Sequence, residues 1–371
     1  MAKKKRSQSK PTAAKPAAPA RAAKPKTPKQ VSKPAAHATP SKVSAKVKVP
    51  PKTAGLLTPA QMRKLEAARR AAKREMRTEL KRRVAEYKLA IKPSTPAKAK
   101  AARKGDPTTP PPISMAGGAA RPFRIIAEGD SWFHYPVPFK GGGIPAFITR
   151  KTDIHILNLA HYGEEVRQML GVEQRRILEE ILADDATRPD ALLFSGGGND
   201  LVGDQFCLWL NKRGGSDEPA AAINSLILDH VFAVVRKGYH DLISMRDTLA
   251  PLCHIFVHPY DFPMPSNTGV CGVGPWLKPS LDYRGWTDPD VQFEIVKLLL
   301  SKFRELLEQL IAANPGAPNR GEIILVNTQE TLDPSPAKKH WGNEIHPSPT
   351  GFGLVADEWI KALKAKFPMI F

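Results

Sequence analysis

The stretch Ala127-Glu128-Gly129-Asp130-Ser131-Trp132-Phe133-His134-Tyr135 decides how the rest of this sequence is interpreted. It continues the apolar run Phe123-Arg124-Ile125-Ile126, which predicts a short buried strand. A Gly-Asp-Ser that leaves such a strand places a hydroxyl at the carboxyl edge of a sheet, where open α/β sheets bind ligands. The three residue types are also common in turns, so the tripeptide alone favours a plain polar turn. Segments farther along the chain change that interpretation.

The charge of the chain is divided unevenly. Residues 1–120 hold 31 Lys and Arg against 5 Asp and Glu, a net charge of +26, whereas the remaining 251 residues carry a net charge of −6. The basic character of the chain therefore belongs to its N-terminal third. The rest predicts a mildly acidic globular domain that is long enough to bury a substantial core.

The N-terminal third divides into three segments. Residues 1–57 are almost entirely Lys, Ala, Pro, Ser and Thr, which predicts a disordered basic tail because little apolar surface offsets the cost of ordering. Residues 58–92 predict a basic amphipathic helix, which Thr58 caps and Pro59 begins. Residues 93–120 are rich in Pro, Gly and Ala and predict a flexible linker to a domain over 121–371.

The predicted helix has a narrow apolar stripe and otherwise basic faces. Such a helix can pack on a partner helix, lie on an anionic membrane, follow nucleic-acid phosphates, or remain a solvated charged helix. The sequence leaves these alternatives open. We expect nucleic acid or another polyanion as a partner of residues 1–92.

Beyond residue 121, short apolar runs alternate with helical patterns. The runs lie at 123–128, 154–160, 190–195, 254–258 and 322–327, and the helical patterns near 164–184, 220–250, 287–314 and 350–366. Five strands that alternate with helices predict a parallel sheet covered on both faces, a three-layer α/β/α domain. The aromatic and proline-rich segment 259–286 is expected to form a wall of a pocket.

Four polar segments occur at the structural positions where a site would form. Gly129-Asp130-Ser131 follows the first strand, and Asn158-Leu159-Ala160-His161-Tyr162-Gly163 follows the second. Gly197-Gly198-Asn199-Asp200 follows the third strand, and Asn343-Glu344-Ile345-His346-Pro347 precedes the last helix. Each segment is weak alone, but their joint order predicts one constellation.

This pattern resembles the SGNH (GDSL-type) hydrolase family, whose four blocks are named for Ser, Gly, Asn and His. The resemblance covers roughly residues 121–371. It implies a flavodoxin-like sheet and hydrolysis of esters, commonly of lipids, acetylated sugars or small molecules. The G-x-S-x-G motif of α/β-hydrolases is absent.

The resemblance also implies a role for each residue. Ser131 would attack an acyl carbonyl, and His346 would take its proton and deliver it to the leaving alcohol. The backbone N–H groups of Ser131 and Gly163, with the side-chain amide of Asn199, would form the oxyanion hole, and glycine would let its amide approach the substrate closely. Two carboxylates would orient the loops by hydrogen bonds: Asp130 and Asp200.

The chain departs from the family pattern at one position. The family has Asp three residues before the histidine, and this chain has Asn343. An amide can orient an imidazole but cannot stabilise the imidazolium as a carboxylate does, and in serine proteases this exchange costs about ten-thousandfold in rate, chiefly through the wrong tautomer. Glu344 and Asp333 are close in sequence, so the third member of the triad stays open.

Cofactors and compartment follow from the composition. The histidines show no metal-ligand spacing with acidic partners, so we expect neither a metal nor another cofactor. Three cysteines, Cys207, Cys253 and Cys271, form no Cys-x-x-Cys pair and are expected to be reduced and buried. No secretory signal and no transmembrane segment are expected, which predicts a cytoplasmic protein.

Two functions compete at this point. The first is a serine esterase of the SGNH type that acts on a small ester, a lipid or an acylated sugar. The second is a catalytically weak or inactive SGNH-type fold that binds a ligand and is tethered to a polyanion by its basic tail; Asn343 favours this alternative.

Overall fold

The computed structural model describes residues 59–90, 122–136, 142–270 and 272–371. The expected tail over 1–57 and the expected linker over 93–120 lie outside these residues. The described residues from Arg63 to Phe371 form one compact unit, and Pro59–Met62 are not part of it. In the described part of the chain, no helix is long and apolar enough to span a membrane.

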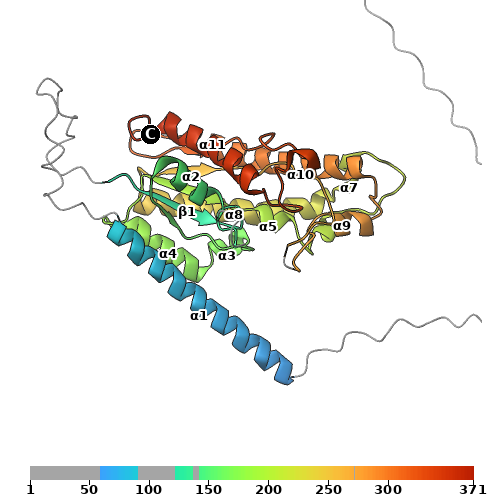
Figure 1. Ribbon diagram of the computed structural model, residues 1–371, viewed down its shortest axis with the longest axis horizontal. Coiled ribbons are helices and arrows are strands. Elements are labelled where there is room, and N and C mark those ends of the chain that lie inside the picture. The colour runs from blue at the N-terminus through green and yellow to red at the C-terminus, as the bar shows by residue number, and fades with distance from the viewer. Residues whose placement is uncertain (1–58, 91–121, 137–141, 271) are drawn as a thin grey trace, which may run out of the picture. The chain divides into compact units, whose positions relative to one another are not determined.

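A single five-stranded sheet forms the centre of the compact unit (Figure 1). Its strands are β1 (Ile125–Gly129), β2 (Ile156–Asn158), β3 (Ala191–Ser195), β4 (His254–Val257) and β5 (Ile323–Leu325). They follow the order β2-β1-β3-β4-β5, and every neighbouring pair is parallel. This is the flavodoxin-like order: β2 lies on one side of β1, and β3, β4 and β5 follow on the other side. The predicted five-stranded parallel sheet is therefore confirmed.

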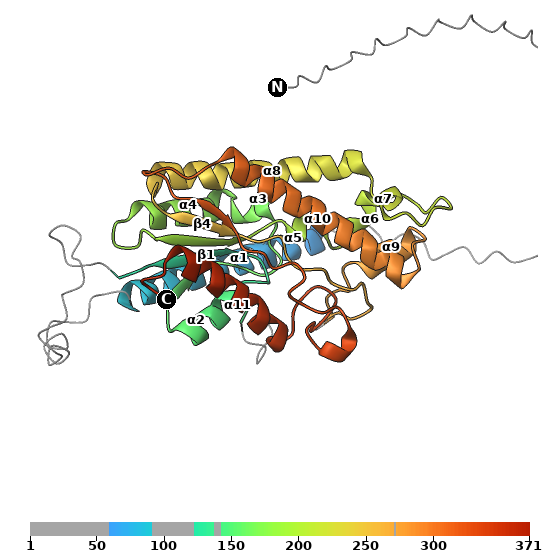
Figure 2. The same ribbon diagram turned by 90° about the horizontal axis from the view of Figure 1, so that it is seen from above.

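Helices cover both faces of the sheet, which makes the domain three-layered. On one side α2 (Ile144–Thr152) packs against α11 (Pro349–Lys366), and on the other α8 (Ser225–Leu249) packs against the remaining long helices (Figure 2). The long helices that contact α8 are α4 (Val172–Ala183) and α10 (Pro289–Ala313), and the short helix α3 (Val166–Met169) contacts it as well. Five short elements lie in the loops: α5 (Gly198–Leu201), α6 (Phe206–Trp209), α7 (Pro219–Ala222), α9 (Lys278–Tyr283) and η2 (Pro336–Lys338).

Local sequence explains where the long helices begin. Asn224, Asp288 and Ser348 cap α8, α10 and α11 by accepting backbone N–H groups of the first turn. Proline stands in the first turn of α10 and α11, where its missing N–H costs nothing. The helical pattern expected over 164–184 is divided between α3 and α4, because Gly171 interrupts it.

The sheet's central strands are buried on both faces. Every residue of β1 and β3 is buried, as expected for parallel strands covered by two helix layers. Gly129, the last residue of β1, approaches β3 so closely that an added Cβ would lie 2.6 Å from the carbonyl oxygen of Ser195. Only glycine fits at this strand end, and the chain turns directly from it into Asp130 and Ser131.

Helix α1 (Pro59–Ala90) packs on the same domain. The predicted stripe is buried at Leu80 and Tyr87 and partly buried at Met76 and Val84, whereas Met62 is 48% exposed. Ion pairs from Lys73 to Glu173 and from Lys88 to Asp184 connect α1 with α4. The apolar stripe of this basic helix thus contacts the hydrophobic core of the compact unit.

Candidate functional site

The Ser131 loop begins where β1 ends. The N–H of Asp130 donates to the carbonyl of Ser195 on β3 (3.0 Å), and the N–H of His161 donates to the carbonyl of Gly129 (3.0 Å). The carbonyl of Asp130 then accepts the N–H groups of Phe133 and His134, which closes a tight turn around Ser131. The nucleophile candidate is therefore held by the strands on both sides of β1.

Ser131 and His346 meet although 215 residues separate them in the chain. The Ser131 Oγ lies 2.6 Å from the Nε2 of His346, and both residues are buried. His346 lies in the segment before α11, where Trp132 Nε1 donates to the carbonyl of Ile345 (3.1 Å). The rings of Tyr135 and Trp276 flank its imidazole, at centroid distances of 4.9 and 5.3 Å.

Asn343 lies beside the ring nitrogen of His346 that does not face Ser131. Its Oδ1 accepts the backbone N–H groups of Ile345 and His346 and lies 2.9 Å from His346 Nδ1. Its Nδ2 donates to the Tyr135 hydroxyl oxygen (3.0 Å). Two backbone donors and a tyrosine therefore fix which end of the amide faces the imidazole. His346 then carries its proton on Nδ1, and the Nε2 lone pair faces Ser131.

The other two carboxylates do not replace Asn343 among the described residues. Glu344 is buried and accepts four backbone N–H groups from the segment 266–278. Asp333 accepts the backbone N–H of Ser335 (2.8 Å).

Burial lowers the pKa of His346 to about 3, so the imidazole is neutral at ordinary pH. Among the described residues, the ring nitrogens of His346 contact Ser131 and Asn343 and no carboxylate.

The two expected oxyanion residues outside the Ser131 loop are joined through Glu164. Asn199 Nδ2 donates to the carbonyl of Glu164 (2.9 Å), which leaves the second N–H of the amide available. Gly163, the residue before Glu164, has a positive φ of 78°. A Cβ at Gly163 would meet no protein atom within 4 Å, so within the protein it is the left-handed backbone that favours glycine there.

The carboxylates expected to support the loops do make such hydrogen bonds. Asp130 accepts the N–H of Trp132 (2.9 Å) and the hydroxyls of Ser195 (3.0 Å) and Tyr260 (2.6 Å). Asp200 accepts the N–H of Val166 (2.9 Å), the first residue of α3. Burial raises the pKa of each carboxyl to about 6 despite these donors.

A second Ser–His pair lies behind the first. His258 Nε2 lies 2.9 Å from Ser195 Oγ, and His258 Nδ1 lies 3.3 Å from Thr328 Oγ1. Ser195 donates its single proton to Asp130, so His258 must donate through Nε2 and cannot serve as a base toward Ser195. Both residues are fully buried. Sequence reasoning did not identify this cluster, because Ser195 and His258 end ordinary apolar strands.

A cavity of about 40 Å³ adjoins Ser131. Ser131 and Asn199 line it together, whereas Gly163 is not among its lining residues. Tyr260, Asp261 and Pro263 contribute a wall, which is the role expected for the segment that begins at residue 259. The remaining lining residues are Asp130, Trp132, Gly198, Val202, Leu300 and Ile345.

Among the described residues, no group of His, Cys, Asp and Glu side chains is arranged to hold a metal ion. Within the same residues, Cys253 is buried and Cys207 is partly exposed, and both are free thiols. The expectation of a buried thiol therefore fails at Cys207, whose sulfur donates to the carbonyl of Asp204 (3.5 Å). Nothing in the chemistry of Ser131 and His346 requires a bound group.

No protein-family model and no curated protein matches the chain. Solved structures do. A lipase from a goat rumen metagenome has 16% sequence identity and a TM-score of 0.43, and the match covers 65% of this chain and 97% of that one. A protein of Slackia heliotrinireducens described as an SGNH hydrolase has 14% identity and a TM-score of 0.39, over 65% and 98% of the two chains. A member of the lipolytic G-D-S-L family from Veillonella parvula has 16% identity and a TM-score of 0.39, over 66% and 99%. The structural neighbours of this chain are SGNH and GDSL-like hydrolases and lipases, at low sequence identity.

Proposed function

We propose that the protein is a serine hydrolase that cleaves an ester through an acyl-enzyme on Ser131. The observation that carries this proposal is the 2.6 Å contact between Ser131 Oγ and His346 Nε2, while His346 Nδ1 faces Asn343. A hydroxyl whose proton can pass to an oriented imidazole is what nucleophilic catalysis at neutral pH requires. The fully buried Ser195 lacks such a base.

The proposed reaction has two halves. His346 Nε2 takes the Ser131 proton while Oγ bonds to the carbonyl carbon, and the imidazolium then gives that proton to the departing alcohol. In the second half, His346 deprotonates a water molecule that attacks the acyl ester, and the acid and free Ser131 are released. The N–H groups of Ser131 and Gly163 and the amide of Asn199 stabilise the charge on the carbonyl oxygen in both halves. Each such donor contributes about 3 kcal/mol to the stability of the transition state.

Asn343 orients the base without adding charge. Its Oδ1 is held toward His346 by two backbone donors, so the productive tautomer does not depend on a carboxylate. An amide stabilises the imidazolium less than a carboxylate would. We therefore expect an active enzyme whose rate is below that of a Ser-His-Asp triad.

The cavity beside Ser131 favours a small acyl group. Its volume is about 40 Å³. One water molecule needs about 10–15 Å³ of such space, so the cavity holds only a few non-hydrogen atoms and suits an acetyl-sized group better than a long acyl chain. Trp132, Val202 and Leu300 give part of its lining an apolar character that matches a methyl group. We propose acetyl or similarly short esters as the substrate class.

A chain-length series tests the proposal. The full chain should hydrolyse p-nitrophenyl acetate faster than p-nitrophenyl octanoate, and His346→Ala should reduce acetate turnover by about 10³-fold or more. Turnover of acetate that is no faster than that of His346→Ala would contradict the proposed hydrolase and favour a ligand-binding fold without activity. Faster turnover of octanoate would contradict the short-acyl assignment alone.

The basic helix supports a second candidate function, attachment to a polyanion through residues 1–92. Helix α1 contains eleven Lys and Arg and four Glu, and Lys64, Arg74 and Lys81 are exposed. Lysine and arginine side chains that neutralise phosphates make binding steeply dependent on salt. Replacing these three residues by Gln should weaken binding to duplex DNA and flatten its salt dependence. Unchanged affinity and an unchanged salt dependence would count against a contribution from α1.

A further inference from the structure

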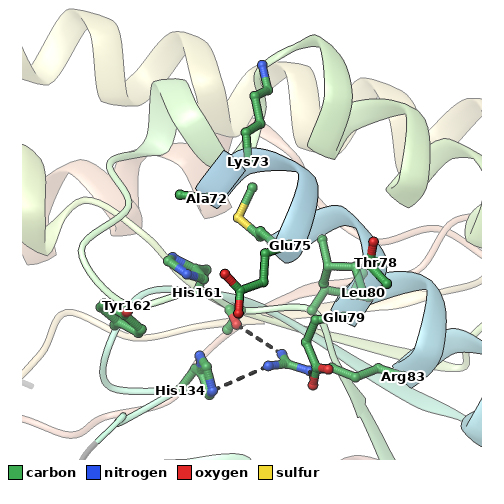
Figure 3. A pocket seen from close by; sticks show the side chains of 13 residues that line it. Ala72, Lys73, Glu75, Thr78, Glu79, Leu80, Arg83, His134, His161 and Tyr162 are labelled. Carbon is green, nitrogen blue, oxygen red and sulfur yellow. Dashed lines mark hydrogen bonds and ion pairs between the residues drawn. The ribbon is translucent and has the colours of Figure 1, made fainter. Parts of the chain in front are cut away.

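Arg83 of helix α1 contacts both loops that carry the proposed site. Its guanidinium donates to the carbonyl oxygens of Asn158 (3.2 Å) and Ala160 (3.4 Å), which precede Gly163. The same guanidinium lies 3.3 Å from Nε2 of His134, three residues after Ser131 (Figure 3). A guanidinium only donates, so His134 accepts through Nε2. One side chain from outside the sheet therefore joins two loops that come from β1 and β2.

The contacts of Arg83 depend on a fixed guanidinium. Its Nε donates to Glu79 Oε1 (3.1 Å), one helical turn earlier, and its side chain is only 20% exposed. Leu80 and Tyr87 flank it along α1 and are buried in the core. The planar fork of arginine can serve several acceptors in fixed directions, which a lysine ammonium cannot do. The packing of α1 thus determines where this fork lies.

Arg83 adds to contacts that the two loops make directly. Asn158 Nδ2 donates to the carbonyl of Phe133 (2.9 Å), and the N–H of His161 donates to the carbonyl of Gly129 (3.0 Å). The His134 ring also lies 6.1 Å from the ring of His161 and 5.9 Å from that of Tyr162. On the α1 side, a cavity of about 730 Å³ is lined by Arg83, His134 and the segment 159–162, so water can reach this side of the loops (Figure 3). Water could replace the lost hydrogen bonds of Arg83 but not its fixed geometry.

We infer that Arg83 is a positioning residue that sets the spacing between the Ser131 loop and the Gly163 loop. This inference rests on the proposed function, because the two loops carry two backbone donors of the proposed oxyanion hole. A displacement of catalytic groups by about 1 Å can cost about a hundredfold in rate. Helix α1, which the sequence places outside the hydrolase domain, would then be part of what makes that domain active.

The test compares Arg83→Ala with Arg83→Lys and with Arg77→Ala in the full chain. Arg77 lies on the same helix, carries the same charge and is exposed, so it controls for the loss of a positive charge. Arg83→Ala should lower kcat for p-nitrophenyl acetate about ten- to hundredfold and change KM less than about threefold. Arg83→Lys should give an intermediate kcat, and Arg77→Ala should match the unmodified chain.

Amide hydrogen exchange provides a readout that does not require activity. Arg83→Ala should speed exchange in peptides that cover 131–136 and 158–163, and Arg77→Ala should not. The inference is overturned if Arg83→Ala matches Arg77→Ala in kcat, or if exchange in the two peptides is unchanged. If the unmodified chain hydrolyses no ester, the proposed function fails, and the exchange result alone decides whether Arg83 positions the loops.

Discussion

Two serine–histidine pairs lie close together in this molecule, and we propose that Ser131 and His346 are the pair that carries out chemistry. Ser131 and His346 are 2.6 Å apart, and Ser195 and His258 are 2.9 Å apart. Burial lowers the pKa of both histidines to about 3. Distance and pKa therefore do not distinguish the pairs.

Proton direction and access do distinguish them. His346 donates through Nδ1 to Asn343 and has its Nε2 lone pair free for the Ser131 proton, and Ser131 lines a cavity. Ser195 gives its proton to Asp130, which fixes His258 as the donor to Ser195. We infer that a serine beside a histidine acts as a nucleophile only when no carboxylate competes with the imidazole for the hydroxyl proton. Ser195 of the inner pair instead holds Asp130, which also accepts the Tyr260 hydroxyl and the N–H of Trp132 in the Ser131 loop.

The largest expected effect separates the two serines. Ser131→Ala should lower turnover of p-nitrophenyl acetate by about 10³-fold or more, because the acyl-enzyme can no longer form. Ser195→Ala should leave kcat within about threefold and lower stability by roughly 1–3 kcal/mol, because His258 and Asp130 lose a buried partner. Kinetics and thermal unfolding of both variants check this prediction. Equal losses of activity would break the distinction between the pairs.

Asn343→Asp sharpens the comparison at the outer pair. A carboxylate beside Nδ1 favours the charged imidazolium, so it should raise the pKa of His346 from about 3. The base is active when neutral, so the acidic limb of the kcat/KM profile should move to higher pH in the variant. Stabilisation of the imidazolium should also raise kcat about tenfold, less than in serine proteases because the amide here already selects the correct tautomer.

The measurement is a kcat/KM profile from pH 2.5 to 9 for the unmodified chain and for Asn343→Asp, a range that includes the pKa of about 3 of His346 in the unmodified chain. The variant can keep the geometry, because Asp Oδ1 can accept the same N–H groups and Oδ2 would face the Tyr135 hydroxyl. An acidic limb at the same pH in both proteins would show that residue 343 does not act on His346.

Tyr260→Phe probes the inner cluster with the smallest expected effect on activity. It removes a hydroxyl that donates to Asp130 (2.6 Å), and it should cost about 1–2 kcal/mol of stability while kcat stays within about threefold. Burial raises the pKa of Asp130 to about 6, and the Tyr260 hydroxyl favours the ionised form. The loss of stability should therefore be greater at pH 8, where Asp130 is ionised, than at pH 5. Thermal unfolding at the two pH values measures it, and a larger loss at pH 5 would contradict the assigned hydrogen bonds.

The sequence predicted much of the fold because strands and long helices have local signals. Short Ile-, Leu- and Val-rich runs marked all five strands, and the helical patterns near 287–314 and 350–366 marked α10 and α11. Helix α2 was not predicted, because it is only nine residues long and follows a run of glycines. Short helices in loops depend on packing more than on their own propensity.

The site was only partly predictable. The order of the four segments predicted that Ser131 and His346 would meet, but no local pattern shows which end of the Asn343 amide faces the imidazole. That choice depends on Tyr135, which lies 208 residues away in the chain. The apolar stripe of α1 indicated that this helix packs against something, but not that its partner is the α/β domain. The contacts of Arg83 therefore could not be predicted. Long-range contacts of this kind leave no periodicity in the sequence.

Locating the reactive serine tests the central claim most directly. The full chain would be treated with a fluorophosphonate, which forms a covalent adduct with activated serines, and the adduct would be located by peptide mass. We expect a single adduct on Ser131 in the unmodified chain and no adduct in His346→Ala. An adduct on Ser195, or no adduct in a protein that hydrolyses p-nitrophenyl acetate, would contradict it.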